Sequence, residues 1–287
     1  MTIVDGKKIR NEILEEIKKE VALLPFQPVF CDVLVGEDPA SVQYVGMKAR
    51  TAESVGIKFH HAKFTATIQT QELTHELKKL NEVKNMCGII IQLPLPAHIN
   101  QQEVFDAIDP ELDVDCLGRV ASEKFYAGDT NIGFPTALSC MALLDSLDLD
   151  LNPSTKLGAS RKIVVLGQGM LVGKPVAALL RFRGLEPIPV DIYTENKEEL
   201  VKEADVIISG MGKGKYITGE KIKKGVVIID AGTSESKGGI VGDVDLESVK
   251  DVASLVSPVP GGVGPVTVAI LLRNVLQVAK QRNGDNS

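Results

Sequence analysis

An aromatic ring and an amine stand four residues apart, at Tyr44 and Lys48. The segment before them predicts the start of a helix, because Asp38 is a favourable N-cap and Pro39 suits the first helical position. Residues four apart share one helix face, so an aromatic ring and an amine could face the same ligand. Taken alone, such a pair more often lies on the protein surface and has no catalytic role.

A neutral amide and several carboxylates could complete a site around that lysine. Gln92 ends the apolar run 88–91, and open α/β sheets bind ligands at the carboxyl edge of their strands. Asp113 and Asp115 lie in an acidic loop further along. The alternative interpretations are that Gln92 satisfies loop backbone groups and that the carboxylates are solvated turn residues.

Glycines in the second half mark a turn from an apolar strand into a helix, in the spacing Gly-x-Gly-x-x-x-Gly. Backbone N–H groups and the helix dipole at such a turn can receive a pyrophosphate. A tight turn with no ligand is the alternative. The residues assigned to this cofactor site are Gly167, Gln168, Gly169, Val172 and Gly173, together with Gly210 after the strand predicted over 205–209.

Asp191 stands at the end of the next predicted strand, about 20 residues after the glycine turn. Its carboxylate could accept hydrogen bonds from an adenosine ribose, and the segment 192–195 holds no Arg or Lys for a 2′-phosphate. This pattern favours NAD over NADP. The alternative is that Asp191 only caps the turn before the following helix.

A loop rich in proline and glycine, from Ser257 to Gly264, leads into a final helix predicted over residues 265–283. Proline stiffens such a loop and glycine removes side-chain walls, so a flat ligand could approach closely. Pro260, Gly261 and Gly262 are the residues assigned to substrate binding. The helix has an apolar stripe at Val268, Leu271, Val275 and Val278.

Composition narrows the classes of function. The chain has 287 residues and a formal net charge of −6, so it offers no basic face to nucleic acid or to an anionic membrane. The longest purely apolar runs are far shorter than the roughly 20 residues that span a bilayer, and the first residues do not resemble a signal peptide. We therefore expect a cytoplasmic protein. Four scattered cysteines and four histidines without metal-site spacing disfavour disulfides and a metal centre.

Alternating strands and helices predict an α/β fold with parallel sheets. In the first half, helices are expected over 9–24, 39–55 and 73–80 and strands over 29–35, 57–64 and 87–92, followed by an irregular region over 93–133. In the second half, helices are expected over 135–147 and 172–183, and strands over 162–167, 188–192, 205–209 and 226–230.

The second series predicts a Rossmann-like, doubly wound dinucleotide-binding domain over residues 138–264. Residues 1–137, joined by the helix 265–283, are expected to form an α/β catalytic domain, with a cleft between the two domains.

The order of these segments resembles the bifunctional methylenetetrahydrofolate dehydrogenase/methenyltetrahydrofolate cyclohydrolases over nearly the whole chain. The resemblance rests on Val4–Lys7, Val35–Ser41 with Tyr44, Val45 and Lys48, Gly88–Pro96, Asp113–Asp115, Val172–Pro175, Val241–Asp245 and the run Ser257–Val268.

This resemblance implies a role for each candidate. Lys48 would be the acid/base residue, Gln92 would hold its amine, Tyr44 would stack on the folate and Asp115 would bind the pterin ring, so these four are assigned to catalysis. Hydride transfer from the methylene carbon to NAD or NADP gives a methenyl cation, which water then attacks. Burial and the substrate cation would favour the neutral Lys48 amine needed for that hydrolysis.

Three departures from the family pattern stand out. Cys116 replaces the glycine that usually follows Asp115, so a glycine-type backbone conformation there would be strained. The segment Phe134–Ser139 keeps the threonine of its usual motif and loses much of the rest. Gln168–Gly169 replace the usual Arg-Ser pair, which removes an expected contact to the NADP phosphate.

Two further functions stay open, a cyclohydrolase alone and a folate or nucleotide sensor without turnover. The expected small-molecule partners are tetrahydrofolate derivatives, and the family suggests a homodimer.

Overall fold

The structure is a computed structural model, and it describes residues 1–147, 149–236 and 239–284. The chain divides into two compact units. The three-stranded unit holds residues 11–135 and the chain from 268 onward, and the six-stranded unit holds residues 1–10 and 136–267. The first ten residues therefore lie outside the unit in which the sequence analysis expected them, because strand β1 (Thr2–Ile3) pairs in parallel with β11 (Leu255–Ser257).

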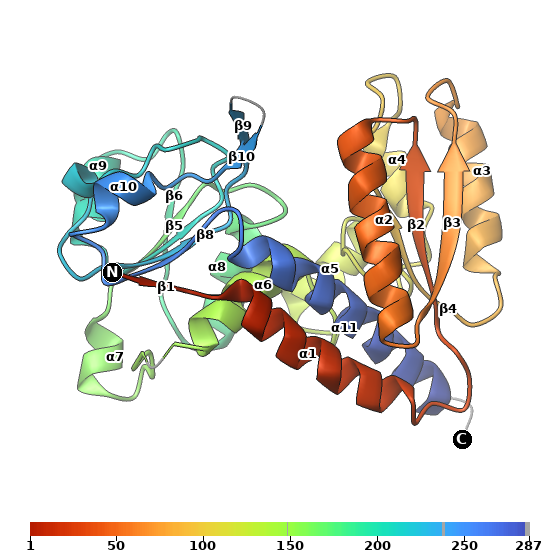
Figure 1. Cartoon of the computed structure of the whole chain (residues 1–287), viewed down its shortest axis with the longest axis horizontal. Helices are drawn as coiled ribbons and strands as arrows, with labels where there is room; N and C mark the ends of the chain where they lie inside the picture. The colour runs from red at the N-terminus through yellow and green to blue at the C-terminus, as the bar shows by residue number, and fades with distance from the viewer. Residues whose placement is uncertain (148, 237–238, 285–287) are drawn as a thin grey trace. The chain divides into compact units, whose positions relative to one another are not determined.

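The three-stranded unit alternates strands and helices as predicted. Its elements, shown in Figure 1, are α1 (Gly6–Val21, which starts in the other unit), β2 (Val29–Val35), α2 (Pro39–Ser54), β3 (Lys58–Phe64), α3 (Thr70–Asn81), β4 (Met86–Ile91), α4 (Gln101–Asp106), α5 (Arg119–Ala127) and most of α11 (Val263–Gly284).

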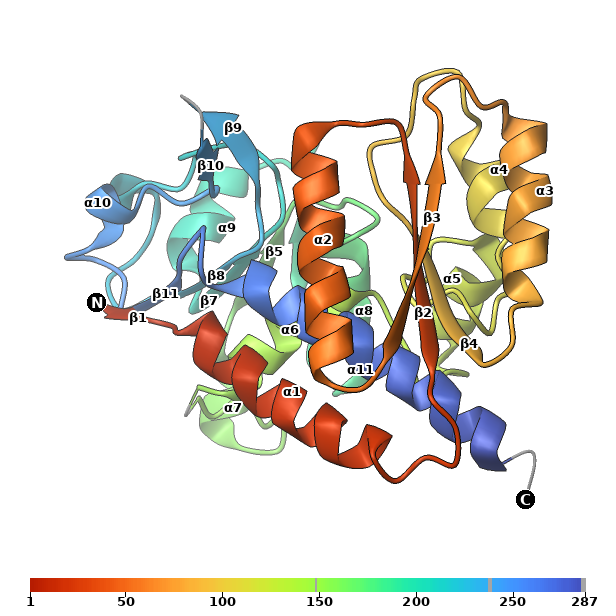
Figure 2. The same cartoon turned by 45° about the vertical axis from the view of Figure 1, so that its right-hand side comes forward.

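The sheet of this unit is parallel, in the order β3-β2-β4. Every residue of the central strand β2 is buried, as expected of a strand covered on both faces. Helices α2 and α3 lie on opposite faces of the sheet in both views (Figures 1 and 2). The crossover places the start of α2 directly after the carboxyl end of β2, where its side chains can reach a ligand site.

The region 93–133, predicted to be irregular, contains two short helices. Asn100 caps α4 by accepting a hydrogen bond from the N–H of Glu103 at 3.3 Å. Helix α5 buries only Ala121 and Phe125. So few buried positions give a weak helical period, which is why the pattern did not reveal these helices.

The six-stranded unit carries the predicted doubly wound sheet. Its further elements are α6 (Pro135–Asp145), α7 (Lys156–Ser160), β5 (Ile163–Leu166), α8 (Gly173–Phe182), β6 (Ile188–Val190), α9 (Lys197–Glu203), β7 (Val206–Ser209), the 3₁₀ helix η1 (Gly219–Lys221), β8 (Val227–Asp230), β9 (Ser234–Ser236), β10 (Gly239–Val241) and α10 (Leu246–Val249).

Within the described residues, the strands of this sheet run in the order β1-β11-β8-β7-β5-β6, and every neighbouring pair is parallel. After the edge strand β1, the chain enters the sheet at β5, adds β6 on one side and continues with β7 on the other. The strand order therefore reverses between β5 and β7. Open α/β sheets bind ligands at the carboxyl ends of strands on such a reversal.

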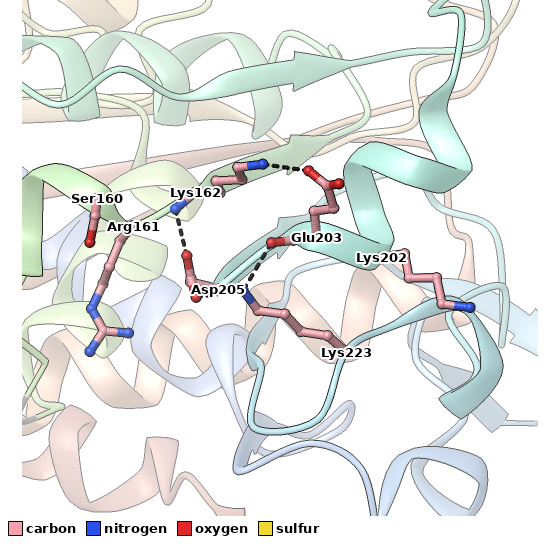
Figure 3. Close-up of a pocket in the computed structure, with 7 residues that line it drawn as sticks. All are labelled: Ser160, Arg161, Lys162, Lys202, Glu203, Asp205 and Lys223. Atoms are coloured by element: carbon pink, nitrogen blue, oxygen red, sulfur yellow. Dashed lines mark hydrogen bonds and ion pairs between the residues drawn. The ribbon is translucent and has the colours of Figure 1, made fainter.

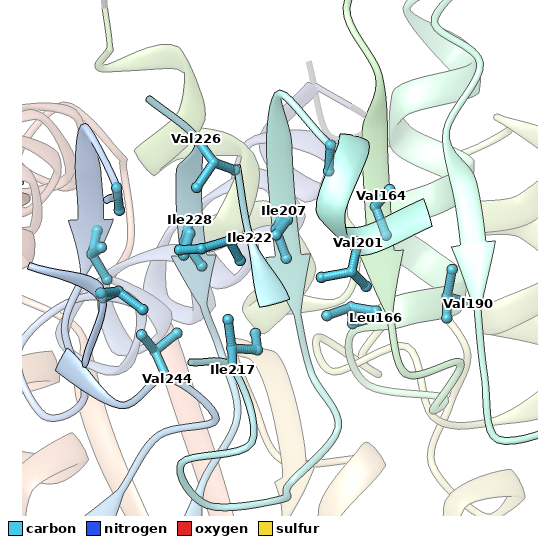
Figure 4. Close-up of a cluster of buried hydrophobic side chains, with 14 residues drawn as sticks. Val164, Leu166, Val190, Val201, Ile207, Ile217, Ile222, Val226, Ile228 and Val244 are labelled. Carbon is cyan, nitrogen blue, oxygen red and sulfur yellow. The ribbon is translucent and has the colours of Figure 1, made fainter. Parts of the chain in front are cut away.

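The core of this unit is aliphatic (Figure 4). Val164 and Leu166 of β5, Ile207 of β7 and Ile228 of β8 point into one cluster, and each is at most 2% exposed. Such runs suit strands buried on both faces. This core supports the carboxyl edge of the sheet, where the loops after the strands begin.

Helix α11 is the one described helix long and apolar enough to cross a membrane, and 67% of the relevant window is buried inside the protein. The predicted stripe of Val268, Leu271, Val275 and Val278 is buried. Its composition is therefore that of a core helix.

Asn274 is the polar exception on the buried face of α11, with 2% of its surface exposed. Its side-chain amide donates to the carbonyl oxygens of Val114 at 2.9 Å and Gly133 at 2.7 Å. Both carbonyls belong to the loop region after β4. Asn274 thereby ties the residue before Asp115 to the C-terminal helix.

We expect Asn274→Ala to lower the free energy of unfolding by about 2 kcal/mol, since it leaves buried carbonyl groups without a donor. Gln277→Ala, on the same helix but half-buried, is the matched control and should change stability by less than about 0.5 kcal/mol. Urea denaturation of both variants measures the difference, and equal midpoints would contradict a role for Asn274 in holding the loop.

Candidate functional site

The predicted Tyr44–Lys48 pair lies on one face of α2. Asp38 caps the helix by accepting from the N–H of Ser41 at 2.8 Å, and Pro39 occupies the first turn, as predicted. The Lys48 Nζ lies 4.8 Å from the centroid of the Tyr44 ring. Lys48 is only 3% exposed, so its amine belongs to the protein interior.

Gln92 holds that amine. The Lys48 Nζ donates to Oε1 of Gln92 at 2.8 Å, and the Gln92 amide donates in turn to the carbonyl oxygen of Leu93 at 2.7 Å. The second hydrogen bond fixes which way the amide points. A strand-end glutamine therefore does more than satisfy the loop, because it presents an acceptor to a buried cation.

Asp32 is the charged neighbour of Lys48 that the sequence analysis missed. It lies in the middle of β2 with 1% of its surface exposed, and its Oδ2 stands 2.6 Å from Lys48 Nζ. The two side chains form a buried ion pair. An acid inside the apolar run 29–35 was the available signal, since aspartate is almost never fully buried without a partner.

The loop that contains Asp115 is held in place by a buried carboxylate. The Asp113 Oδ2 accepts from the N–H of Gly118 at 2.7 Å, and burial raises the pKa of Asp113 to about 6. Burial also raises the pKa of Asp115 to about 7, while the charge of Lys48 opposes the rise. Asp115 is thus balanced between its two protonation states near neutral pH.

Cys116 adopts the glycine-type backbone that the sequence analysis named as strained, with φ of 59°. A left-handed conformation costs a non-glycine residue on the order of 1 kcal/mol. Cys116 is fully buried and its N–H donates to the carbonyl of Asp113 at 3.1 Å. Packing and this hydrogen bond hold the turn that presents Asp115.

Tyr44 has a 38% exposed side chain, although its phenol is perturbed. Desolvation, together with the charges of Asp115 and Asp32, raises the pKa of Tyr44 to about 12. The phenol is therefore neutral at physiological pH, and the ring offers an accessible flat surface.

The predicted glycine turn lies at the carboxyl end of β5. Gly167 has φ of 82°, and a Cβ on it would lie 2.7 Å from the carbonyl oxygen of Gly210. A Cβ on Gly173 would collide with the carbonyl oxygen of Gly167. These glycines are required by the turn itself, and they bring the ends of β5 and β7 together at the strand-order reversal.

Gly169 differs, because a Cβ there would meet nothing within 4 Å. The turn thus exposes bare backbone beside the start of α8, and no side chain caps that helix at Val172. An uncapped helix start leaves N–H donors for an anion. This arrangement fits a dinucleotide pyrophosphate.

Asp191 does cap the turn after β6, as the alternative interpretation holds. Its Oδ1 accepts from the N–H of Tyr193 and from the hydroxyl of Thr194, both at 2.9 Å. The hydrogen bond from Thr194 is the main reason that the pKa of Asp191 is lowered. The side chain is accordingly a fixed negative charge.

Two buried aspartates anchor the loops beyond β7 and β8. Asp243 accepts from the hydroxyl of Ser209 at 2.6 Å and from the N–H groups of Met211 and Lys213 at 2.8 and 2.6 Å. Asp230 accepts from the N–H groups of Gly232, Asp243 and Val244. Asp243 thereby sets the path of the chain after Gly210.

The loop at Pro260–Gly262 is tied to the N-terminal segment of the same unit. The N–H of Gly6 donates to the carbonyl of Gly261 at 3.1 Å, and the N–H of Val4 donates to that of Val256 at 3.0 Å. The loop is therefore supported by residues from the opposite end of the chain.

A hollow of about 490 Å³ opens at the amino edge of the six-stranded sheet (Figure 3). Figure 3 shows Lys162 paired with Glu203, and Lys223 paired with Asp205 at 2.7 Å. Lys162 and Asp205 immediately precede β5 and β7, so the hollow lies opposite the edge that carries the glycine turn. Paired surface charges at this edge do not indicate a ligand site.

Two family profiles match the chain. The catalytic domain of tetrahydrofolate dehydrogenase/cyclohydrolase matches residues 4–115, and the NAD(P)-binding domain of the same family matches residues 135–283. A bifunctional FolD protein from Nitratiruptor is 40% identical over 286 residues, which cover 98% of this chain and 99% of that protein.

Solved structures agree with these matches. The FolD methylenetetrahydrofolate dehydrogenase/cyclohydrolase from Campylobacter jejuni is 33% identical with a TM-score of 0.91, covering 98% of this chain and 99% of that one. The Trypanosoma brucei enzyme, solved with NADP and an inhibitor, is 32% identical with a TM-score of 0.89, covering 98% of each chain.

The fold and these matches define a two-domain α/β enzyme with a nucleotide-binding parallel sheet. The chain belongs to the tetrahydrofolate dehydrogenase/cyclohydrolase family. The resemblance, the fold class and the bifunctional enzyme class expected from the sequence are confirmed. The family matches support that main function rather than the cyclohydrolase-only or sensor alternatives.

The glycine turn generates a matched pair of variants. We expect Gly173→Ala to lower the melting temperature by several degrees, because its methyl group collides with Gly167. Gly169→Ala should shift it by about 1 °C or less, since the space is open. Thermal denaturation checks both, and equal losses would show that Gly169 is also required by packing.

Proposed function

We propose that this protein oxidises 5,10-methylenetetrahydrofolate to the 5,10-methenyl form with NAD or NADP and then hydrolyses the product to 10-formyltetrahydrofolate. The buried Lys48 amine held by Gln92 carries the proposal. Tyr44 beside it supplies a ring on which a folate can stack. The bound nicotinamide would accept the hydride from the methylene carbon.

The hydrolysis step uses the lysine as acid and base. Water adds to the cationic methenyl carbon and gives a proton to the Lys48 amine, which later protonates the leaving ring nitrogen. Gln92 orients the amine for both transfers through its 2.8 Å hydrogen bond. Asp115 accepts hydrogen bonds from the pterin when it is ionised, and a pKa near 7 permits this at neutral pH.

The cofactor is proposed to lie along the residues of the glycine turn, with Gly169 leaving room for the pyrophosphate. NAD is slightly favoured, because ionised Asp191 would repel a 2′-phosphate and Gln168 is uncharged. Pro260, Gly261 and Gly262 remain predicted substrate-binding residues.

The oligomeric state, the cellular location and the partners of the enzyme are also proposals. We propose a homodimer, since β6 is an edge strand and Phe182, Ile192 and Tyr193 near its ends are 54, 77 and 84% exposed. A formal charge of −6 supports a cytoplasmic protein whose partners are folates rather than nucleic acid or membrane.

The test of the proposed function is to supply methylenetetrahydrofolate with NAD or NADP and to follow reduced cofactor and methenyl product separately. We expect turnover with both steps and higher efficiency with NAD. Methenyltetrahydrofolate supplied directly isolates hydrolysis. An absence of turnover with either cofactor would contradict the function, and at least about tenfold higher efficiency with NADP would contradict the preference assigned to Asp191.

Lys48→Met should lower the hydrolysis rate at least about 100-fold, because it removes the group that accepts and returns the proton. Lys58→Met is the matched control, since Lys58 is an exposed lysine on β3 in the same unit. Near-normal hydrolysis by Lys48→Met, measured by the loss of methenyl absorbance, would rule out this role.

A further inference from the structure

The acid that contacts Lys48 lies among apolar residues. Asp32 lies between Cys31 and Val33 on a strand whose other members are apolar and buried. Its register neighbours are His61 on β3 and Ile90 on β4. An ionised carboxylate in this place loses several kcal/mol of hydration, which an apolar residue would not.

The charged and titratable groups around Asp32 come from several elements. Lys48 of α2 is in direct contact at 2.6 Å, and the charge of His61 on β3 also reaches the carboxylate. Tyr44 of α2 and Asp115 of the loop after β4 both respond to the charge of Asp32. Lys48 is therefore the one group among these in ion-pair contact with it.

We propose that Asp32 is the proton partner of Lys48, a positioning residue that shares one proton with the catalytic amine during hydrolysis. The inference rests on the proposed function. Gln92 and Asp32 contact the same nitrogen, so the amine is held by one neutral and one ionisable acceptor. Burial raises the pKa of Asp32 although Lys48 opposes the rise, so the carboxyl competes for the proton more strongly than an exposed aspartate.

With the shared proton on Asp32, the Lys48 amine is neutral and takes a proton from the water that attacks the methenyl carbon. The positive charge thus passes from the substrate to Lys48. Lys48 then protonates the ring nitrogen as its bond to the carbon breaks, and the new hydroxyl releases its proton to solvent as the formyl group forms. One proton is released in each turnover.

Asp32→Asn tests the proposal through the pH dependence of hydrolysis. Asparagine cannot take the shared proton from the amine, so we expect the acid limb of the rate profile to move up by about one pH unit or more. Hydride transfer moves no proton, so the dehydrogenase rate should change less than about threefold. Asp106→Asn, a carboxylate that pairs with Arg119 in the same unit, should leave the profile unchanged.

A purely structural role predicts another result, a lowered melting temperature with a profile that superimposes on that of the original protein. That outcome would overturn the proposal. Asp32→Val provides a second variant if Asp32→Asn does not fold, because valine matches the other residues of β2. The same upward shift is expected of it, and an unshifted profile or a downward shift again overturns the proposal.

Carbon-13 NMR of aspartate carboxyl groups tests the pair without any activity. The Asp32 signal is assigned by its loss in Asp32→Asn. We expect it to titrate above the usual aspartate range and to move higher still in Lys48→Met, which removes the opposing cation. An identical titration with and without Lys48 would overturn the pairing. A shifted titration in a protein that hydrolyses no methenyl substrate would instead refute the proposed function alone.

Discussion

The candidate site of the three-stranded unit depends on the burial of the Lys48 amine beside a parallel sheet. Lys48 is 3% exposed, and taking an ammonium out of water costs several kcal/mol unless its donors are satisfied. Asp32 supplies an ion-pair contact and Gln92 supplies a hydrogen bond. Each partner comes from a neighbouring strand, so the sheet order β3-β2-β4 is what brings both to one nitrogen.

The same constraint explains why the adjoining loop is built with so much internal bonding. Asp115 is close enough to Lys48 to respond to its charge, and the loop that carries it is held from both sides. Asp113 holds the turn from within through Gly118, and Asn274 holds the preceding carbonyl from α11. Cys116 adopts an unfavourable backbone conformation within this hydrogen-bonded loop. A substitution at Asn274 would therefore disturb Asp115 without touching it.

The sequence predicted those parts of the fold and site that depend on local patterns. Capping by Asp38 and the four-residue spacing of Tyr44 and Lys48 are properties of one helix, and both were found as expected. Asp32 was missed because its contact with Lys48 forms only when α2 packs against β2. The first ten residues were misplaced for a similar reason, since β1 is only two residues long and its pairing with β11 is set by long-range contacts.

The glycine turn shows how one motif combines two physical requirements. Gly167 and Gly173 are glycine because the backbone at the end of β5 approaches itself too closely for a side chain. Gly169 faces open space, so folding alone does not demand it. A pattern of three glycines cannot separate these cases, because all three look alike in sequence. The structure separates them, and the residue free of packing is the one best placed to admit a ligand.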